Sequence, residues 1–149
     1  MSVKYDIFIG DFLEKVTERD LLMLAPKERD EVVLGYMKRS IAGFKKNCLY
    51  DLTSTRDDVL LEFNIDIREE DLDEIVDIVS EGMLVQWLKP MAYKKDLYEN
   101  VINTRDFSQY SPAELLLRVG EAYKQAKREY TQKIREYSFN HGELTELHS

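Results

Sequence analysis

The chain has 149 residues, 44% of them hydrophobic, so it fits one domain that can bury a core without a metal or a disulfide. Its formal net charge of -8 argues against a protein that grips nucleic acid, because phosphate binding needs a basic face. The single cysteine, Cys48, excludes an internal disulfide, and no apolar run approaches the roughly 20 residues of a membrane span. The first residues lack the apolar segment of a signal peptide, so we expect a soluble protein of a reducing compartment.

The first third of the chain predicts two helices. Apolar residues recur at helical spacing over residues 6–16, which indicates a short packing helix. Residues 17–20 resemble a capping box, although Asp20 stands where Glu or Gln is usual, so one further turn is expected over residues 21–24. Pro26 is expected to begin a second helix that ends near Lys46. The predicted buried stripe of this helix is Val33, Met37, Ile41, Phe44 and Cys48.

The middle of the chain predicts a loop and then a long helix. Residues 47–63 are irregular, with turn and cap residues at 53–55, so we expect a loop with one short helical turn. Residues 64–67 alternate apolar and polar side chains, as a short extended stretch would. Acids at 69–71 then begin a third helix, and Pro90 ends it or kinks it after one more turn. Its predicted buried stripe is Leu72, Ile75, Val76, Val79, Met83, Trp87 and Leu88.

A second long helix is predicted near the C-terminus. Residues 93–103 are expected to be helical and residues 104–110 to form a turn. The stretch 111–114 then combines a capping box with Pro112 at the first helical position, and it predicts a helix of about 40 Å that ends near Asn140. Tyrosines at 123, 130 and 137 have heptad spacing, which favours an amphipathic seam with hydroxyls in water over a stacking platform.

The predicted fold class is all-α. We expect a small antiparallel helical bundle with two long helices, a mid-chain loop and an extended C-terminal tail. One helical domain would cover residues 1–140, and the tail would cover residues 141–149. Four glycines lie inside helical patterns, where each costs about 1 kcal/mol relative to alanine, so we interpret them as points of close helix packing. They are Gly35, Gly43, Gly82 and Gly120.

No pattern in the sequence indicates catalysis or a cofactor. His141 and His148 are far in sequence from Cys48, so no zinc signature exists. Every glycine is isolated, which excludes a glycine-rich phosphate loop. Acid pairs such as Asp57 and Asp58 are typical of solvated faces unless a pocket shifts their pKa values. We therefore expect neither an enzyme nor a metal site.

Charge is distributed unevenly along the chain. Residues 57–81 contain eleven acids and a single base, whereas residues 32–50 contain four bases and no acid. Acids at helix starts and bases at helix ends complement the helix macrodipole, which explains part of this pattern. A charge-matched contact between subunits is the other explanation, and both stay open.

Three stretches carry a resemblance to a known family, namely Ser80–Pro90, Tyr110–Leu116 and Ile134–Ser138 with the following His141-Gly142. Through them, most of the chain resembles the head-tail connector (adaptor or neck) proteins of tailed phages and prophages of Gram-positive bacteria. The resemblance is one of general sequence pattern and involves no catalytic signature. The resemblance implies a structural virion protein that forms a ring, commonly of twelve copies, below the portal. Such a ring would continue the DNA channel toward the tail.

The resemblance also implies three functional regions. The C-terminal tail would dock on the portal, and its Leu144 and Leu147 would suit pairing as an added strand. The loop at 47–66 would face the channel, where acids would keep passing DNA from sticking. A ring also needs two complementary subunit surfaces, here one basic and one acidic. The docking residues are His141, Gly142, Glu143, Leu144, Thr145, Glu146 and Leu147; the channel acids are Asp57, Asp58, Glu62 and Asp66; the subunit contact residues are Lys38, Arg39, Lys45, Lys46, Glu69, Glu70, Asp73 and Asp77.

The expected partners are further copies of the chain, the portal protein and the next neck or tail-completion protein. DNA would be passing cargo, no membrane would be involved, and the protein would assemble in the host cytoplasm and end in the virion neck. One alternative is another neck or tail-completion component of the same particle. Another is a small acidic helical protein that binds a host factor, including one that mimics DNA.

Overall fold

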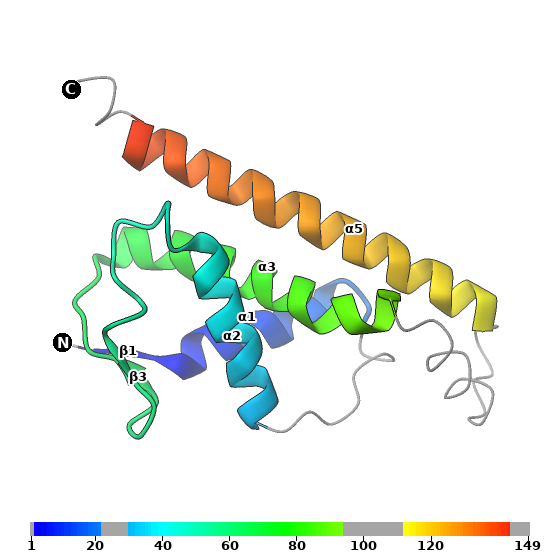
Figure 1. The fold of residues 1–149 in the computed structure, drawn as a ribbon, viewed down its shortest axis with the longest axis horizontal. Helices are drawn as coiled ribbons and strands as arrows, with labels where there is room; N and C mark the ends of the chain where they lie inside the picture. The colour runs from blue at the N-terminus through cyan, green and yellow to red at the C-terminus, as the bar shows by residue number, and fades with distance from the viewer. Residues whose placement is uncertain (1, 22–29, 94–111, 144–149) are drawn as a thin grey trace.

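The computed structural model describes residues 2–21, 30–93 and 112–143, and this part of the chain is mostly helical. Helices α1 (Tyr5–Glu18), α2 (Asp30–Phe44) and α5 (Pro112–Tyr137) all pack against α3 (Glu69–Tyr93). In Figure 1, α3 and α5 lie side by side and run in opposite directions, whereas α2 crosses them. The 26 residues of α5 span about 39 Å. The helical class expected from the sequence is confirmed in this broad sense.

A small sheet corrects the all-α prediction. Strands β1 (Val3–Lys4), β2 (Arg56–Asp57) and β3 (Glu62–Phe63) form an antiparallel sheet in the order β1-β3-β2. The predicted loop with one helical turn is therefore wrong, because its second half is a β-hairpin. Residues 64–67, where an extended stretch was considered, contain no strand. Strands of two residues are too short to show a period of two, so the sequence pattern could not reveal them.

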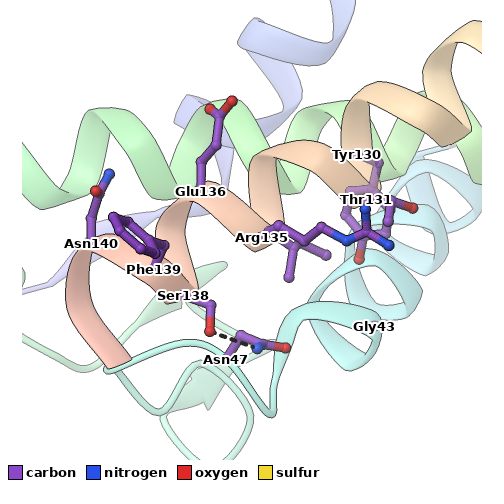
Figure 2. A pocket seen from close by; sticks show the side chains of 10 residues that line it. Gly43, Asn47, Tyr130, Thr131, Arg135, Glu136, Ser138, Phe139 and Asn140 are labelled. Carbon is purple, nitrogen blue, oxygen red and sulfur yellow. Dashed lines mark hydrogen bonds between the residues drawn. The ribbon is translucent and has the colours of Figure 1, made fainter. Parts of the chain in front are cut away.

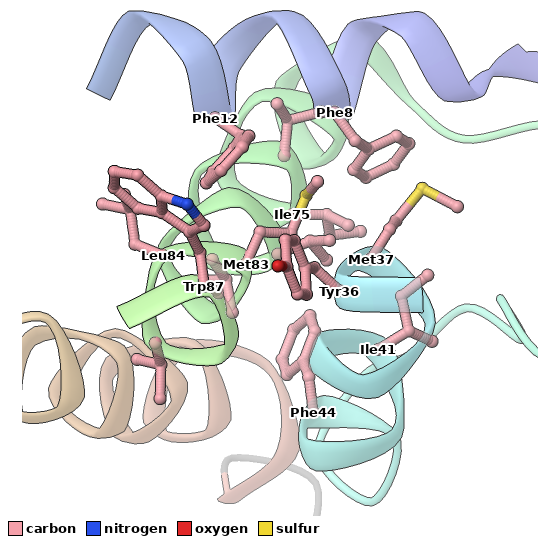
Figure 3. Packing of buried hydrophobic residues seen from close by; sticks show 14 of the residues in the cluster. Phe8, Phe12, Tyr36, Met37, Ile41, Phe44, Ile75, Met83, Leu84 and Trp87 are labelled. Carbon is pink, nitrogen blue, oxygen red and sulfur yellow. The ribbon is translucent and has the colours of Figure 1, made fainter. Parts of the chain in front are cut away.

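The hydrophobic core surrounds α3. Phe12 of α1 meets Trp87 of α3 edge to face, with ring centroids 6.0 Å apart. Figure 3 shows Met37, Ile41 and Phe44 of α2 reaching the same cluster from the other side. The predicted stripe of α3 is confirmed, since all its members are buried except the half-buried Leu72. In α2 the three central stripe residues are buried and Val33 is half-buried against the core. The predicted stripe is wrong at Cys48, because α2 ends at Phe44 and this half-buried residue lies beyond it.

The capping box predicted at residues 17–20 is wrong, because these residues end α1. Asp20 has a φ of 57°, its N–H donates to the Thr17 carbonyl, and the N–H of Leu21 donates to the Val16 carbonyl at 2.9 Å. This pair of hydrogen bonds is a Schellman motif, which usually has glycine at the left-handed position. Asp20 in that position concealed the helix end. The predicted helix start at Pro26 lies outside the described residues.

Close packing at glycine is confirmed at two of the four predicted positions. A Cβ on Gly82 would lie 2.0 Å from Ser40 Oγ and 2.6 Å from Tyr130 Cε1, and a Cβ on Gly43 would lie 2.6 Å from the Tyr130 hydroxyl. The Tyr130 hydroxyl donates to the Ser40 carbonyl at 2.6 Å. Helices α2, α3 and α5 therefore meet at this point. At Gly35 and Gly120 a Cβ would meet no atom of the described residues within 4 Å, so the packing interpretation is wrong there for this part of the chain.

Both long helices have the predicted course where the structure describes them. Pro90 lies inside α3, which continues to Tyr93, and α5 begins at Pro112. After α5 the backbone forms a π-helical turn, η2 (Ser138–Glu143), which extends three residues past the predicted domain end. The predicted helix beyond residue 93, the turn at 104–110 and the capping serine at 111 lie outside the described residues.

Candidate interaction surfaces

A charged network that the sequence reading missed is buried between α1, α3 and α5. Glu81 of α3 has no exposed surface, and its two carboxylate oxygens accept hydrogen bonds from Arg19 at 2.5 and 2.6 Å. Lys133 of α5 donates to the same carboxylate at 3.1 Å, and Arg19 also pairs with Glu129 at 2.8 Å. The hydrogen bond to Glu81 raises the pKa of the Arg19 guanidinium. Each buried charge thus faces an opposite one.

Asp77 continues this network one turn earlier in α3. Its carboxylate accepts hydrogen bonds from Lys15 of α1 at 2.5 Å and from Lys133 at 3.0 Å. Burial alone would raise the pKa of Asp77, but these two hydrogen bonds outweigh it and lower the pKa. Asp77 was predicted to contact a neighbouring subunit, whereas the structure places it against two lysines of its own chain. We interpret the network as structural, because it joins three helices.

The sequence carried a weak signal for this network. Glu81 is the one charged residue in the mostly apolar stretch from Ile78 to Val85, where an unpaired carboxylate would be costly. Lys15 similarly lies between Phe12 and Val16 on the buried side of α1. The partners come from three helices far apart in the chain, so no local spacing could identify them.

The hairpin between β2 and β3 carries most of the predicted channel acids. Asp57 accepts hydrogen bonds from the Val59 and Leu60 amides of the turn, both at 3.0 Å. Asp58 accepts from the Tyr5 hydroxyl at 2.8 Å and from Lys38 at 3.0 Å, and these two hydrogen bonds lower the pKa of its carboxyl. The acids at the base of the hairpin are therefore fixed by their own chain.

The remaining two predicted channel acids lie close by in sequence. Glu62 in β3 accepts a hydrogen bond from the Ser2 hydroxyl at 3.1 Å, and Asp66 is exposed beyond the hairpin. Asp57, Asp58 and Glu62 thus accept hydrogen bonds from groups of their own chain. One of these groups, Lys38, is a cation and offsets the charge of Asp58.

The tip of the hairpin is apolar. Val59, Leu60 and Leu61 are 90%, 66% and 45% exposed. Leu61 has a φ of 56°, which is unusual for a leucine, and its carbonyl accepts a hydrogen bond from the Tyr5 amide at 3.0 Å. We call these three residues the knob. It is held in one shape by the turn amides at its base and by the contact with α1.

The other predicted subunit contact residues lie on two separate surfaces. Lys38 pairs with Asp58 of its own chain, whereas Arg39, Lys45 and Lys46 at the end of α2 are exposed. The acids Glu69, Glu70 and Asp73 are exposed at the start of α3. Acids in this first turn are favoured by the helix macrodipole, so their position needs no partner to explain it. A contact between these two surfaces of neighbouring subunits stays a prediction.

The C-terminal end of the described chain packs on the body. His141, predicted as the first residue of the docking tail, lies 2.9 Å from the Glu74 carboxylate and stacks on Tyr137 with ring centroids 4.4 Å apart. Tyr137 is fully buried, and its hydroxyl accepts a hydrogen bond from the Leu49 amide at 3.2 Å. The tyrosines do pack on the inner side of α5, but the predicted exposure of their hydroxyls to water is wrong for Tyr130 and Tyr137, whose hydroxyls bind backbone groups. Leu144 to Leu147 lie outside the described residues.

A groove of about 960 Å³ separates the end of α2 from the end of α5 (Figure 2). Asn47 donates a hydrogen bond to the Ser138 hydroxyl at 3.3 Å across it, and Phe139 is 60% exposed at its edge. Gly43 and Ile134 also line it. We call this feature the α2/α5 groove. Its lining residues are Gly43, Asn47, Tyr130, Thr131, Ile134, Arg135, Glu136, Ser138, Phe139 and Asn140.

A basic depression of about 370 Å³ adjoins the groove along α5. It shares Thr131 and Arg135 with the groove and adds Lys124, Lys127 and Arg128. Within the described residues, none of these four bases pairs with a carboxylate, and they lie on the exposed face of α5. The chain is acidic overall, so this stripe stands out, as do the exposed bases near the end of α2. No single sequence motif indicated it, because Glu121, Glu129 and Glu136 are interspersed with these bases in the sequence.

Among the described residues, no helix is both long and apolar enough to cross a membrane, and no group of three or more His, Cys, Asp or Glu side chains could hold a metal ion. No protein-family model matches the chain, and neither a curated protein nor a solved structure shows significant similarity to it.

Proposed function

We propose that this chain is a structural protein of the virion neck, a head-tail connector adaptor that forms a ring below the portal. The observation that carries the proposal is the knob. Val59 and Leu60 are 90% and 66% exposed on a hairpin whose base is fixed by hydrogen bonds. Adjacent exposed apolar side chains that are held rigidly are typical of a surface that binds another protein.

Two further features support an assembly role. The three C-terminal stretches resemble connector adaptors, and two of them lie largely in α3 and α5, the long antiparallel pair of the structure. The net charge of -8 suits a protein that lets DNA pass without binding it. In this proposal the ring has about twelve copies, contacts the next neck or tail-completion protein below, and treats DNA as passing cargo.

The tail after Glu143 is the proposed portal anchor. Helix α5 and η2 form a continuous helical path from Pro112 to Glu143, so they fix where the tail leaves the body. Leu144 and Leu147 would then pair with the portal as part of an added strand. His141 serves in this scheme as the hinge point on the body, through its contact with Glu74.

The test is to mix the purified protein with portal rings from the same phage or prophage and to measure the mass of the complex by native mass spectrometry. We expect a large stoichiometric complex that the double variant Leu144→Ser, Leu147→Ser does not form. A matched control is Leu117→Ser, which changes a leucine that is 64% exposed on α5.

If the unchanged chain forms no complex with portal rings, the adaptor proposal is wrong. A complex with isolated tail-completion protein would then favour another neck component. Binding to neither would favour a regulatory protein for a host factor.

A further inference from the structure

We propose that the knob of one copy inserts into the α2/α5 groove of the next copy, so that this contact builds the ring. The inference rests on the proposed function, and it names the two surfaces that the ring would use. It replaces the predicted contact between the ends of α2 and α3 with a contact that is both apolar and charge-matched.

The apolar parts of the two surfaces match. The knob offers three aliphatic side chains that leave the hairpin at its tip. The groove has a volume of about 960 Å³, the size of a pocket that can enclose a small apolar group. Gly43 lines the groove on the α2 side, while Ile134 and the 60% exposed Phe139 provide apolar walls on the α5 side. Insertion would cover apolar surface on both partners at once.

The charged parts match as well. Asp57 and Asp58 lie at the base of the knob, Arg135 lines the groove, and Arg128 lines the basic depression that adjoins it. Within the described residues, neither arginine has a carboxylate partner. The acid of the groove, Glu136, is held by Gln132 at 3.2 Å. Asp58 is paired with Lys38 of its own chain, whereas the hydrogen-bond partners of Asp57 are neutral turn amides. The Asp57 carboxylate would therefore meet the Arg135 guanidinium in the groove, which would orient the knob.

The placement of the two surfaces favours a second copy as the occupant. In Figure 1 the hairpin and the C-terminal end of α5 both lie at the left end of the molecule, but on its lower and upper edges with α3 between them, so the knob does not reach the groove of its own chain. Each copy consequently offers one knob and one groove on different faces. A contact of this kind is heterologous, and repeated heterologous contacts give a closed ring or a helical filament.

The knob also has little ordering cost. Asp57 binds the turn amides, and the Leu61 carbonyl accepts from the Tyr5 amide before any partner arrives. A preformed surface loses less conformational entropy on binding than a flexible loop does. This preformed shape distinguishes the hairpin from a flexible surface loop that has no binding role.

The experiment compares single substitutions by sedimentation velocity over a wide range of protein concentration. Leu60→Asp alters the knob, Phe139→Asp alters the groove, and Leu117→Asp is the control because Leu117 and Leu60 are 64% and 66% exposed. We expect the unchanged chain and the control to self-associate equally. The knob and groove variants should associate at least about 30-fold more weakly, as expected for central interface residues. Arg135→Glu should weaken association too, and circular dichroism checks that each variant is folded.

A mixture of the two weakened variants tests the head-to-tail geometry. The Leu60→Asp chain keeps its groove and the Phe139→Asp chain keeps its knob, so together they should form a dimer of one copy each and nothing larger. The inference is overturned if Leu60→Asp self-associates as the control does, if the mixture stays monomeric, or if the unchanged chain is monomeric at every concentration. Portal binding then decides the adaptor proposal independently, because the unchanged chain would still bind portal rings if only the knob contact were wrong.

Discussion

Gly82 tests the packing of the three helices most directly. In Gly82→Ala the new methyl group would lie 2.0 Å from Ser40 Oγ, 2.6 Å from Tyr130 Cε1 and 2.8 Å from Ser40 Cβ. The serine hydroxyl could turn away, but it would then lose its hydrogen bond to the Val79 carbonyl, which measures 2.7 Å. The tyrosine ring and the serine Cβ cannot turn away, so α2 and α5 must shift from α3.

The expected magnitude combines three contributions. Crowding in a packed core costs about 1–3 kcal/mol, and losing the Ser40 hydrogen bond costs about 1 kcal/mol. Replacing a helical glycine by alanine returns about 1 kcal/mol. The free energy of unfolding should therefore fall by about 1–3 kcal/mol. Gly120→Ala is the matched control, because a Cβ there meets no atom of residues 2–21, 30–93 and 112–143 within 4 Å and only the helical gain of up to about 1 kcal/mol remains.

Urea unfolding followed by circular dichroism at 222 nm measures both variants under the same conditions. The two substitutions are chemically identical and should have opposite signs, separated by about 2–4 kcal/mol. If Gly82→Ala is as stable as Gly120→Ala, the three helices do not meet at Gly82 as described. The arrangement of α2 and α5 on α3 would then be wrong.

Two further predictions concern the buried charged network. Glu81→Gln should lower the free energy of unfolding by about 3 kcal/mol, because it leaves Arg19 and Lys133 without their buried carboxylate. The exposed control Glu121→Gln should change the free energy of unfolding by less than about 0.5 kcal/mol. Equal effects of the two substitutions in urea unfolding would show that Glu81 is not paired as described. Asp77 has a lower pKa in the folded chain than its unfolded value near 3.9, so its stabilisation is complete above that value and is lost as the pH falls through the folded pKa. Asp77→Asn should therefore flatten the loss of stability below about pH 4 in urea titrations, and an unchanged acid slope would contradict the assignment.

The hairpin shows why the predicted site and the structural site differ. Asp57 and Asp58 drew attention in the sequence because acids suggest a surface that repels DNA. In the structure these acids bind the turn amides, Tyr5 and Lys38, and the apolar tip is what protrudes. From hydrophobicity alone, three consecutive apolar residues such as Val59, Leu60 and Leu61 would be predicted to be buried. The sequence does not show that they lie in a turn that projects from the body of the protein.

The sequence by itself determined the features that depend on local periodicity. The buried stripe of α3, the start of α5 at Pro112 and its length of about 39 Å follow from positions that repeat every 3.6 residues and from a proline that suits a first turn. Tight packing at Gly82 does not follow in this way, because the same argument from helical glycines applied equally to Gly35 and Gly120, where the structure shows no such contact within the part of the chain that it describes.

Only the tertiary structure decided the features that join distant parts of the chain. Val3 pairs with Phe63, Arg19 pairs with Glu81, and the α2/α5 groove takes its walls from two helices. Each depends on which surfaces meet after the helices have formed. Which surfaces meet depends on the packing of the whole core, so it produces no periodic pattern within any single segment of the sequence.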